Sequence, residues 1–197
     1  MTEERKPGQG TTSEEYLRSV TLGPREPINS TIHLAPYNPS WPIAFERHAQ
    51  RIRAALGVKV LLLEHVGSTS VPGLSAKPVV DIVLAVADSA DEASYVPPLE
   101  GQGYVLRLRE PAWFEHRLLK SPENNVKIHV FADGCEEIDR MLAFRDWLRA
   151  HEQDRRLYEE TKHRLAQRSW KYTQHYADAK SAVVGEILER ALGKRGE

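Results

Sequence analysis

The order of patterns along the chain predicts an α+β fold with a helical C-terminal part. Short apolar runs that suit buried strands dominate the middle of the chain, and from about residue 136 apolar residues recur at the spacing of α-helices. No internal repeat interrupts this order. Because strands precede a block of helices, and because 197 residues suffice for one hydrophobic core, we expect a single domain of this class.

The first 30 residues are expected to form a mobile extension with one short helix. Residues 1–12 are polar and rich in Gly, Pro and Thr, which is typical of a flexible tail. Thr12 and Glu15 have the spacing of a capping box, which predicts a helix start at this point. A linker follows, so the domain itself is expected at residues 31–192, with a tail at 193–197.

The elements of this domain are predicted from apolar periodicity and from turn residues. Ser40 is expected to cap the first helix, Pro42 lies in its first turn, and Gly57 ends it. The predicted strands cover residues 32–37, 60–66, 79–86, 104–109, 113–119 and 126–131, and a short helix covers 95–101. Three helices are predicted at the C-terminal end, at 136–150, 152–168 and 173–192.

Charge and composition narrow the class of function. The net charge is −1 and the sequence pI is about 6.7, so general nucleic-acid binding is not expected. Cys135 is the single cysteine, which excludes an internal disulfide and favours a reducing compartment. No apolar run approaches the roughly 20 residues that span a bilayer, and the N-terminus lacks the apolar core of a signal peptide. We expect a cytoplasmic protein without membrane contact.

Asp81 is an isolated acid in the apolar run 79–86. This run is apolar on both faces, which indicates a central strand, and Asp81 shares one face with Val83 and Ala85. A buried carboxylate is costly unless it is paired or coordinated. Asp81 is therefore either the partner of a core cation or a ligand for a metal or substrate, and composition leaves both interpretations open.

A turn of small residues, Gly67-Ser68-Thr69-Ser70, follows the strand predicted at 60–66. Gly67 allows close approach of the backbone, and Ser68 offers both a hydroxyl and an N–H group. Such a turn can hold an anion such as phosphate. Gly-Ser pairs also occur in ordinary turns, but this one is followed 13 residues after Ser68 by the acid of a core strand.

The stretch EHVGSTSVPGL, with KPVVDI after it, closely resembles the signature of the GrpB family, which has a nucleotidyltransferase-like fold. Further similar segments are PYNPSWP at 36–42, VKIHVF at 126–131, FRDWLRAH at 144–151 and YADAKSAVV at 176–184. The resemblance covers residues 31–192. It implies a nucleotidyltransferase-like mixed β-sheet with helices packed on it.

The resemblance also implies a chemistry for the site. In nucleotidyltransferases the turn holds a triphosphate, and strand carboxylates hold Mg²⁺ for in-line transfer. Asp81 and Glu64 are the candidate metal ligands here. The sequence departs from the pattern at Val83, where a second acid is usual, and in VKIHVF, where Lys127 or His129 faces the site and no acid is present.

Two cations fall within apolar helical stripes, Arg145 in 136–150 and Lys180 in 173–192. They either pair with internal acids such as Asp81 or Glu64, or line a cleft and meet an anionic ligand. Arg117 is a further candidate cation, whereas the pair Tyr158–Lys162 is interpreted as surface support. The expected phosphate-binding residues are Gly67, Ser68, Thr69, Lys77, Arg117, His129, Arg145 and Lys180.

Two functions follow from these expectations. The first is an enzyme that transfers a nucleotidyl or phosphoryl-type group, with Ser68 gripping phosphate, Asp81 holding metal or positioning the nucleophile, and Mg²⁺ as the candidate cofactor. The second is a catalytically degenerate nucleotidyltransferase fold that acts as a binding or accessory module. In both, the partner is a small phosphate-bearing ligand. Relatives that are fused behind a dephospho-coenzyme A kinase suggest a nucleotide or a coenzyme A precursor.

Overall fold

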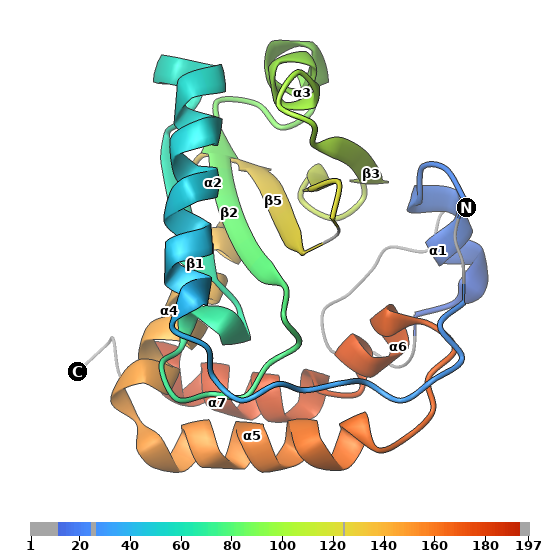
Figure 1. Cartoon of the computed structure of the whole chain (residues 1–197), viewed down its shortest axis with the longest axis vertical. Coiled ribbons are helices and arrows are strands. Elements are labelled where there is room, and N and C mark those ends of the chain that lie inside the picture. Colours follow the sequence, from blue (N-terminus) through green and yellow to red (C-terminus); the bar gives the residue numbers. More distant parts are fainter. Residues whose placement is uncertain (1–11, 25–26, 124, 194–197) are drawn as a thin grey trace.

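A five-stranded mixed sheet forms the centre of the computed structural model, which describes residues 12–24, 27–123 and 125–193 (Figure 1). The strand order is β1-β2-β5-β4-β3, with β2 and β5 parallel and the other neighbouring pairs antiparallel. The strands are β1 (Leu62–Val66), β2 (Val80–Val86), β3 (Val105–Glu110), β4 (His116–Lys120) and β5 (Val126–Ala132). The predicted α+β fold with a mixed sheet is thereby confirmed.

Helices cover the sheet and continue beyond its lower end in Figure 1. They are α1 (Glu14–Val20), α2 (Ser40–Leu56), α3 (Glu92–Glu100), α4 (Glu136–Ala150), α5 (Glu152–Ala166), α6 (Thr173–Asp178) and α7 (Ser181–Gly193). Two short 3₁₀ turns, η1 (Gly57–Lys59) and η2 (Ser68–Ser70), lie before and after β1. The helical C-terminal part is therefore also confirmed. Within the described residues, no helix is both long and apolar enough to cross a bilayer.

The central strand β2 is buried on both faces, as its continuous apolar sequence predicts. Ile82 and Leu84 pack with α2 and α3 in the larger core, while Val83 and Ala85 pack with Phe131 and with α4 on the opposite face. A separate cluster holds α4, α5 and α7 together below the sheet. Asp81 belongs to the same face as Val83 but lies at the beginning of the strand, where this core ends.

Three predicted elements need correction. Residues 32–37 do not form a strand, because their backbone groups bond to loops and a helix end: Ile32 N–H donates to Ala166, and Ala35 bridges Ala76. The predicted helix 173–192 is two helices, because the chain makes a tight turn in which Lys180 N–H bonds to Ala177. Strand β4 begins only at His116, because positive φ angles at the two preceding residues form a turn.

The helix starts also differ from the predictions by one to three residues. Ser13, and not Thr12, caps α1, since its Oγ accepts from the N–H of Tyr16 at 3.1 Å. Ser40 is the first residue of α2 and Pro39 takes the cap position. Helix α3 begins at Glu92 rather than at residue 95.

The described part of the N-terminal extension packs against the sheet. Leu17 and Val20 are buried, and Thr21 forms a bridge to Leu108 on β3. The hydroxyl of Tyr16 lies 3.0 Å from Oε1 of Glu110, also on β3. The predicted tail residues 1–11 and 194–197 lie outside the described residues.

Candidate functional site

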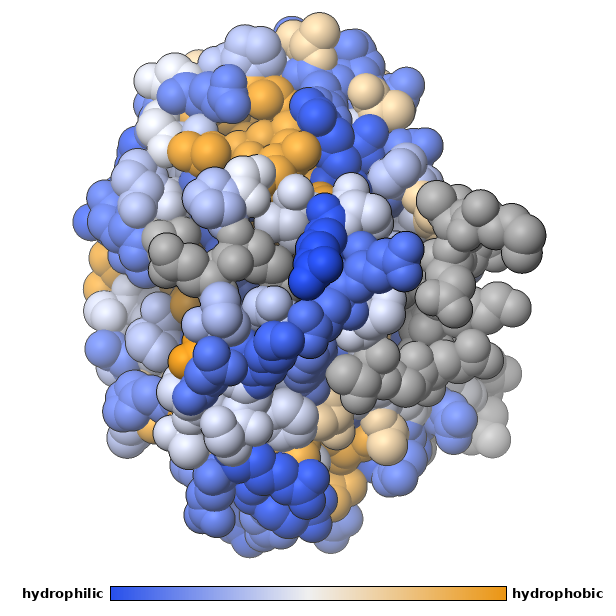
Figure 2. All heavy atoms as spheres, turned by 90° about the vertical axis from the view of Figure 1, so that its right-hand side faces the viewer, coloured by the Kyte–Doolittle hydropathy of each residue, from blue (hydrophilic) through white to orange (hydrophobic). Residues whose placement is uncertain are grey.

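A cavity of about 360 Å³ lies between the C-terminal helices and the face of the sheet that carries Asp81, Leu118 and His129. Its walls come from the η2 turn, from all five strands, and from residues of α4, α5 and α6. We call it the lysine cavity, after its four lysines Lys77, Lys127, Lys162 and Lys180. Figure 2 shows the side of the molecule that lies to the right in Figure 1, on which hydrophilic residues predominate.

Gly67 brings the turn after β1 directly onto Asp81. Its φ angle is +70°, a conformation that glycine adopts readily and other residues rarely do. A Cβ atom at this position would lie 2.7 Å from Oδ2 of Asp81, which is far inside contact distance. Two independent constraints thus require glycine here, and both hold the turn and the carboxylate together at the cavity wall.

Ser68 is the turn hydroxyl that is available to a ligand. Thr69 donates its hydroxyl to the carbonyl of Val79 at 3.3 Å and lies 3.0 Å from Nε2 of His65, so it ties the turn to the sheet. Ser70 donates to the carbonyl of Gly67 at 2.6 Å. Thr69 lines the cavity but its hydroxyl is engaged, whereas that of Ser68 has no partner among the described residues.

Four lysines reach the cavity from different elements. Lys77 precedes β2, Lys127 lies on β5, Lys162 on α5, and Lys180 in the turn between α6 and α7. Within the described part of the chain, none of the four has a carboxylate at ion-pair distance. They therefore place four amino groups around the cavity, with the carboxylate of Asp81 among them.

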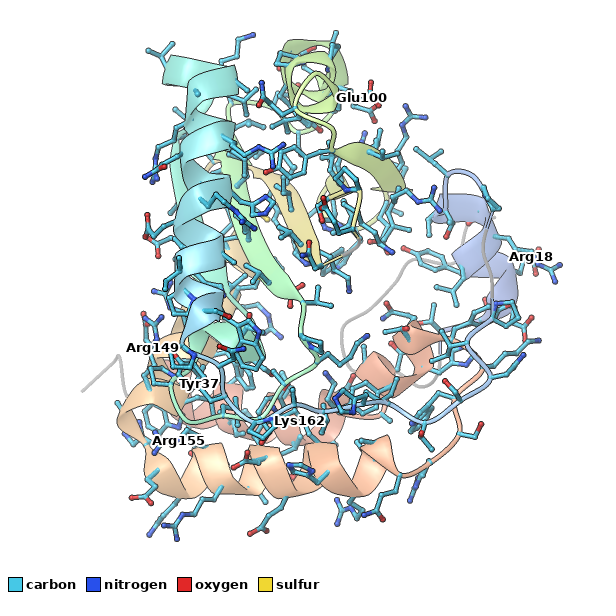
Figure 3. All side chains as sticks on the ribbon, in the orientation of Figure 1. Arg18, Tyr37, Glu100, Arg149, Arg155 and Lys162 are labelled. Atoms are coloured by element: carbon cyan, nitrogen blue, oxygen red, sulfur yellow. The ribbon has the colours of Figure 1, made fainter. Side chains whose placement is uncertain are left out.

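Lys162 is the most enclosed of the four, with 2% of the residue exposed. In Figure 3 it lies on the side of α5 that faces the rest of the molecule. Its Nζ donates to the carbonyl of Ser75 and lies 4.9 Å from the centre of the Tyr158 ring. The interpretation of Tyr158 and Lys162 as surface support is therefore wrong, because both residues are buried.

Burial and mutual repulsion lower the pKa of two of these lysines. Burial, reinforced by the charge of Lys180, lowers the pKa of Lys162 to about 7. The pKa of Lys77 falls to about 8, because of burial and then the charges of Lys127 and Lys180, with Asp81 opposing. An anion in the cavity would relieve this repulsion and restore the protonated forms.

Asp81 is an ionised acid in this cationic surrounding. Burial alone would raise its pKa, but the hydrogen bond from His129 and the positive charges of Lys127, His129 and Lys180 lower it overall. Its Oδ1 lies 3.5 Å from Nε2 of His129. Asp81 thus has His129 as a partner and also lines the cavity.

His129 links Asp81 to a chain of polar side chains. Its Nδ1 lies 3.2 Å from Nε2 of His116, whose Nδ1 lies 2.7 Å from Oε2 of Glu110. Glu110 in turn meets the hydroxyl of Tyr16. The two imidazole rings are stacked, with centroids 5.3 Å apart. The chain connects Asp81 in the cavity to a buried carboxylate on β3.

Three predicted site residues do not line the cavity. Arg117 points to the other face of β4, where Glu92 accepts from its Nε at 2.6 Å, and His116 faces the cavity instead. Arg145 donates to Glu64 at 2.7 Å. Glu64 lies two residues before Val66 on the edge strand β1. Its carboxylate forms an ion pair with Arg145 there and does not line the cavity.

Sequence reasoning did not single out Lys162, His116 or Glu110 as functional residues. Lys162 follows Tyr158 and Thr161 on the buried side of α5, so the helical stripe was a usable signal. His116 was assigned to a strand but its direction depends on the turn before it. Glu110 gave no signal, because its partner His116 lies across the hairpin of β3 and β4.

The side chains in the cavity do not fit the pair of Mg²⁺ ions that the resemblance implies. Two-metal sites need several carboxylates, and Mg²⁺ prefers oxygen ligands. Asp81 is joined in the cavity by His129 and His116, and Glu110 is taken by His116. Over the described residues, no group of three His, Cys, Asp or Glu side chains has the arrangement of a metal site.

Comparisons with known proteins agree over nearly the whole chain. The family described as "GrpB protein" matches residues 31–190. A UPF0157 protein of Halalkalibacterium halodurans is 58% identical over 91% of this chain and 92% of that protein. A dephospho-CoA kinase of Mycolicibacterium paratuberculosis is 30% identical over 86% of this chain but only 48% of its own length. The crystal structure of conserved protein GrpB from Enterococcus faecalis superimposes with a TM-score of 0.74, at 33% identity, over 84% of this chain and all of that one.

Proposed function

Because the chain belongs to the GrpB family, we propose a function for the cavity that its fold encloses: it binds a small phosphate-bearing metabolite. The ligand class is a nucleotide or a coenzyme A precursor. The nucleotidyltransferase-like character of the fold is part of this proposal, since in that superfamily a turn after a strand holds phosphate.

The observation that carries the proposal is the set of four lysines that surround Asp81 and have, among the described residues, no carboxylate at ion-pair distance. Clustered, half-buried cations repel one another, so they are retained only where something compensates them. A phosphate group does so with two negative charges and several acceptor oxygens. Lys77 and Lys127 approach it from the sheet, and Lys162 and Lys180 from the helices.

The turn and the remaining walls suit the rest of such a ligand. The free hydroxyl of Ser68 is placed to donate to a phosphate oxygen at the end of β1. Phe144, Met141 and Tyr176 line the helical side and offer apolar surface to an organic group. A volume of about 360 Å³ is within the range of small-molecule sites.

The coenzyme A part of the proposal rests on the similarity to a protein named dephospho-CoA kinase. This chain spans 48% of that protein. If the ligand of the lysine cavity is related to the substrate of such a kinase, a phosphate-bearing coenzyme A precursor is among the first ligands to test.

A transferase is the second candidate function. It is favoured by the chain from Asp81 through His129 and His116 to Glu110, which a binding module does not need. Transfer would depend on these groups and on the lysines, because the donor set does not fit two Mg²⁺ ions.

A thermal-shift screen tests the proposed function. Inorganic pyrophosphate, nucleoside di- and triphosphates and coenzyme A precursors are added with and without Mg²⁺. A ligand at 100 times its Kd is expected to stabilise the fold by about 2.7 kcal/mol. The double variant Lys77→Met, Lys180→Met should lose the shift, and Lys59→Met, an exposed lysine outside the cavity, should keep it. Flat curves across the whole panel would contradict the proposal.

A further inference from the structure

The chain of side chains behind Asp81 has its buried end at Glu110 and its open end in the lysine cavity. The side chains of Glu110 and His116 are 4% and 3% exposed, whereas those of His129 and Asp81 are 20% and 29% exposed. His116 is fixed by rings on its sides, since Phe131 stacks on it at 4.7 Å and Trp113 meets it edge-on at 5.0 Å. The chain is therefore rigid at one end and accessible to a ligand at the other.

Each contact along the chain requires one proton, and counting them shows where a proton can enter. His116 directs Nδ1–H at the carboxylate of Glu110, which leaves its Nε2 as an acceptor. His129 therefore directs Nδ1–H at His116. Its Nε2 faces Asp81, which is an acceptor only. In this arrangement each of the inner two contacts holds one proton, and the outer contact is the place where one proton is gained or lost.

We propose that His129 is a general base for a hydroxyl group that is bound beside Asp81, with His116 and Glu110 as positioning residues. The inference rests on the proposed function, because it assigns a reaction to the phosphate-bearing ligand of the same cavity. Nε2 of His129 removes the hydroxyl proton while the oxygen forms a bond to phosphorus. The bond from phosphorus to the leaving oxygen breaks, and that oxygen departs as a phosphate or pyrophosphate anion with the electron pair.

The surrounding charges suit this step. The imidazolium that forms on His129 pairs with the carboxylate of Asp81, 3.5 Å away, and its Nδ1–H stays bound to His116. The departing anion lies among the lysines. Among the described residues, the charged or titratable groups around the pair are Lys77 before β2, Lys127 on β5, Lys162 on α5, Lys180 before α7, His65 on β1, Glu110 on β3 and His116 on β4.

We call the chain from Asp81 through His129 and His116 to Glu110 the relay. The NMR signals of the histidine ring nitrogens show directly where its protons lie. Nitrogen-15 NMR of the full chain is expected to show a proton on Nδ1 of His116, directed at Glu110, and none on its Nε2. The His129 ring should change between one proton, at Nδ1, and two, with the second at Nε2, and inorganic pyrophosphate should increase its doubly protonated fraction. A purely structural histidine pair would not respond to the anion.

Matched variants separate the relay from a packing role. Glu110→Gln keeps the shape but removes the charge behind His116, and it should lower the doubly protonated fraction of His129 at a given pH. Glu92→Gln removes a charge that Arg109 and Arg117 hold elsewhere, and it should leave both histidines unchanged. If Glu110→Gln does not fold, His129→Gln at the exposed end serves instead; His116 should keep its tautomer and the proton uptake with pyrophosphate should disappear.

Two results would overturn the relay: His116 protonated at Nε2, or a protonation state of His129 that neither pyrophosphate nor Glu110→Gln alters. Binding of pyrophosphate is measured on the same sample, independently of the ring signals. The ring signals thus decide the relay, and the absence of binding would decide against the ligand class.

Discussion

Replacing Lys162 by methionine is expected to stabilise the unliganded protein at pH 6 and to flatten its pH dependence up to pH 9. Lys162 is almost fully enclosed and has no carboxylate partner among the described residues. Its pKa in the folded state is about 7, against 10.5 for an ordinary lysine. The folded state therefore binds fewer protons than the unfolded state between these two values, so stability rises with pH in this window.

The size of the effect follows from the two pKa values. Each pKa unit corresponds to about 1.4 kcal/mol, so the charged form of Lys162 costs about 5 kcal/mol well below pH 7. Between pH 6 and pH 9 the protein should recover about 3 kcal/mol of this through Lys162 alone. Lys77, with a pKa of about 8, adds a smaller rise above pH 8 that remains in the variant.

Urea denaturation of the wild type and of Lys162→Met at pH 6 and pH 9 measures this difference. Lys59→Met is the control, since Lys59 is an exposed lysine and its removal should leave the pH dependence unchanged. Equal gains in stability toward pH 9 in wild type and Lys162→Met would refute the reasoning, because the penalty would then not belong to this lysine.

Three further predictions concern the turn, a single lysine and the metal. Gly67→Ala and Gly73→Ala both place alanine at a positive φ, at a cost of about 1–3 kcal/mol. Only Gly67→Ala also crowds Asp81, so it should lose more stability in urea than Gly73→Ala and should weaken pyrophosphate binding. Equal effects of the two substitutions would contradict a role of the Gly67 turn in the cavity. Lys180→Met should lower pyrophosphate affinity about tenfold in calorimetry with little change in stability, because the residue is half-exposed; lost stability with unchanged affinity would point to a structural role. Pyrophosphate should still bind in EDTA, and a strict need for Mg²⁺ would show that the cavity holds a metal after all.

The centre of the fold and part of the site were predictable from the sequence. A continuous apolar run specifies the central strand β2, and its single acid marks the end of the core where the cavity begins. The Gly67-Ser68 turn was readable because it follows an apolar run and because the acid of a core strand comes 13 residues after Ser68. The placement of Lys180 followed from helical phase, although the turn at residues 179–180 interrupts the helix that the phase assumed.

Partners that are distant in sequence were not predictable. Helical phase shows that Arg145 faces inward, but it does not show that Arg145 donates to Glu64 on an edge strand. Arg117 and His116 differ by one residue, so the turn at Phe114 and Glu115 decides which of them faces the cavity. The buried side of α5 includes Lys162, but the carbonyl of Ser75 that accepts from it lies in a distant loop and was not predictable.

A titration of inorganic pyrophosphate into nitrogen-15-labelled protein shows whether the lysine cavity binds phosphate. The backbone N–H signals of Gly67, Ser68 and Thr69 report on the turn, and those of Lys127 and Lys180 report on the two opposite walls of the lysine cavity. If the lysine cavity binds phosphate, these signals should show saturable shifts, which vanish in the Lys77→Met, Lys180→Met variant. Signals in this region that stay unchanged at saturating pyrophosphate, or shifts confined to another surface, would contradict it.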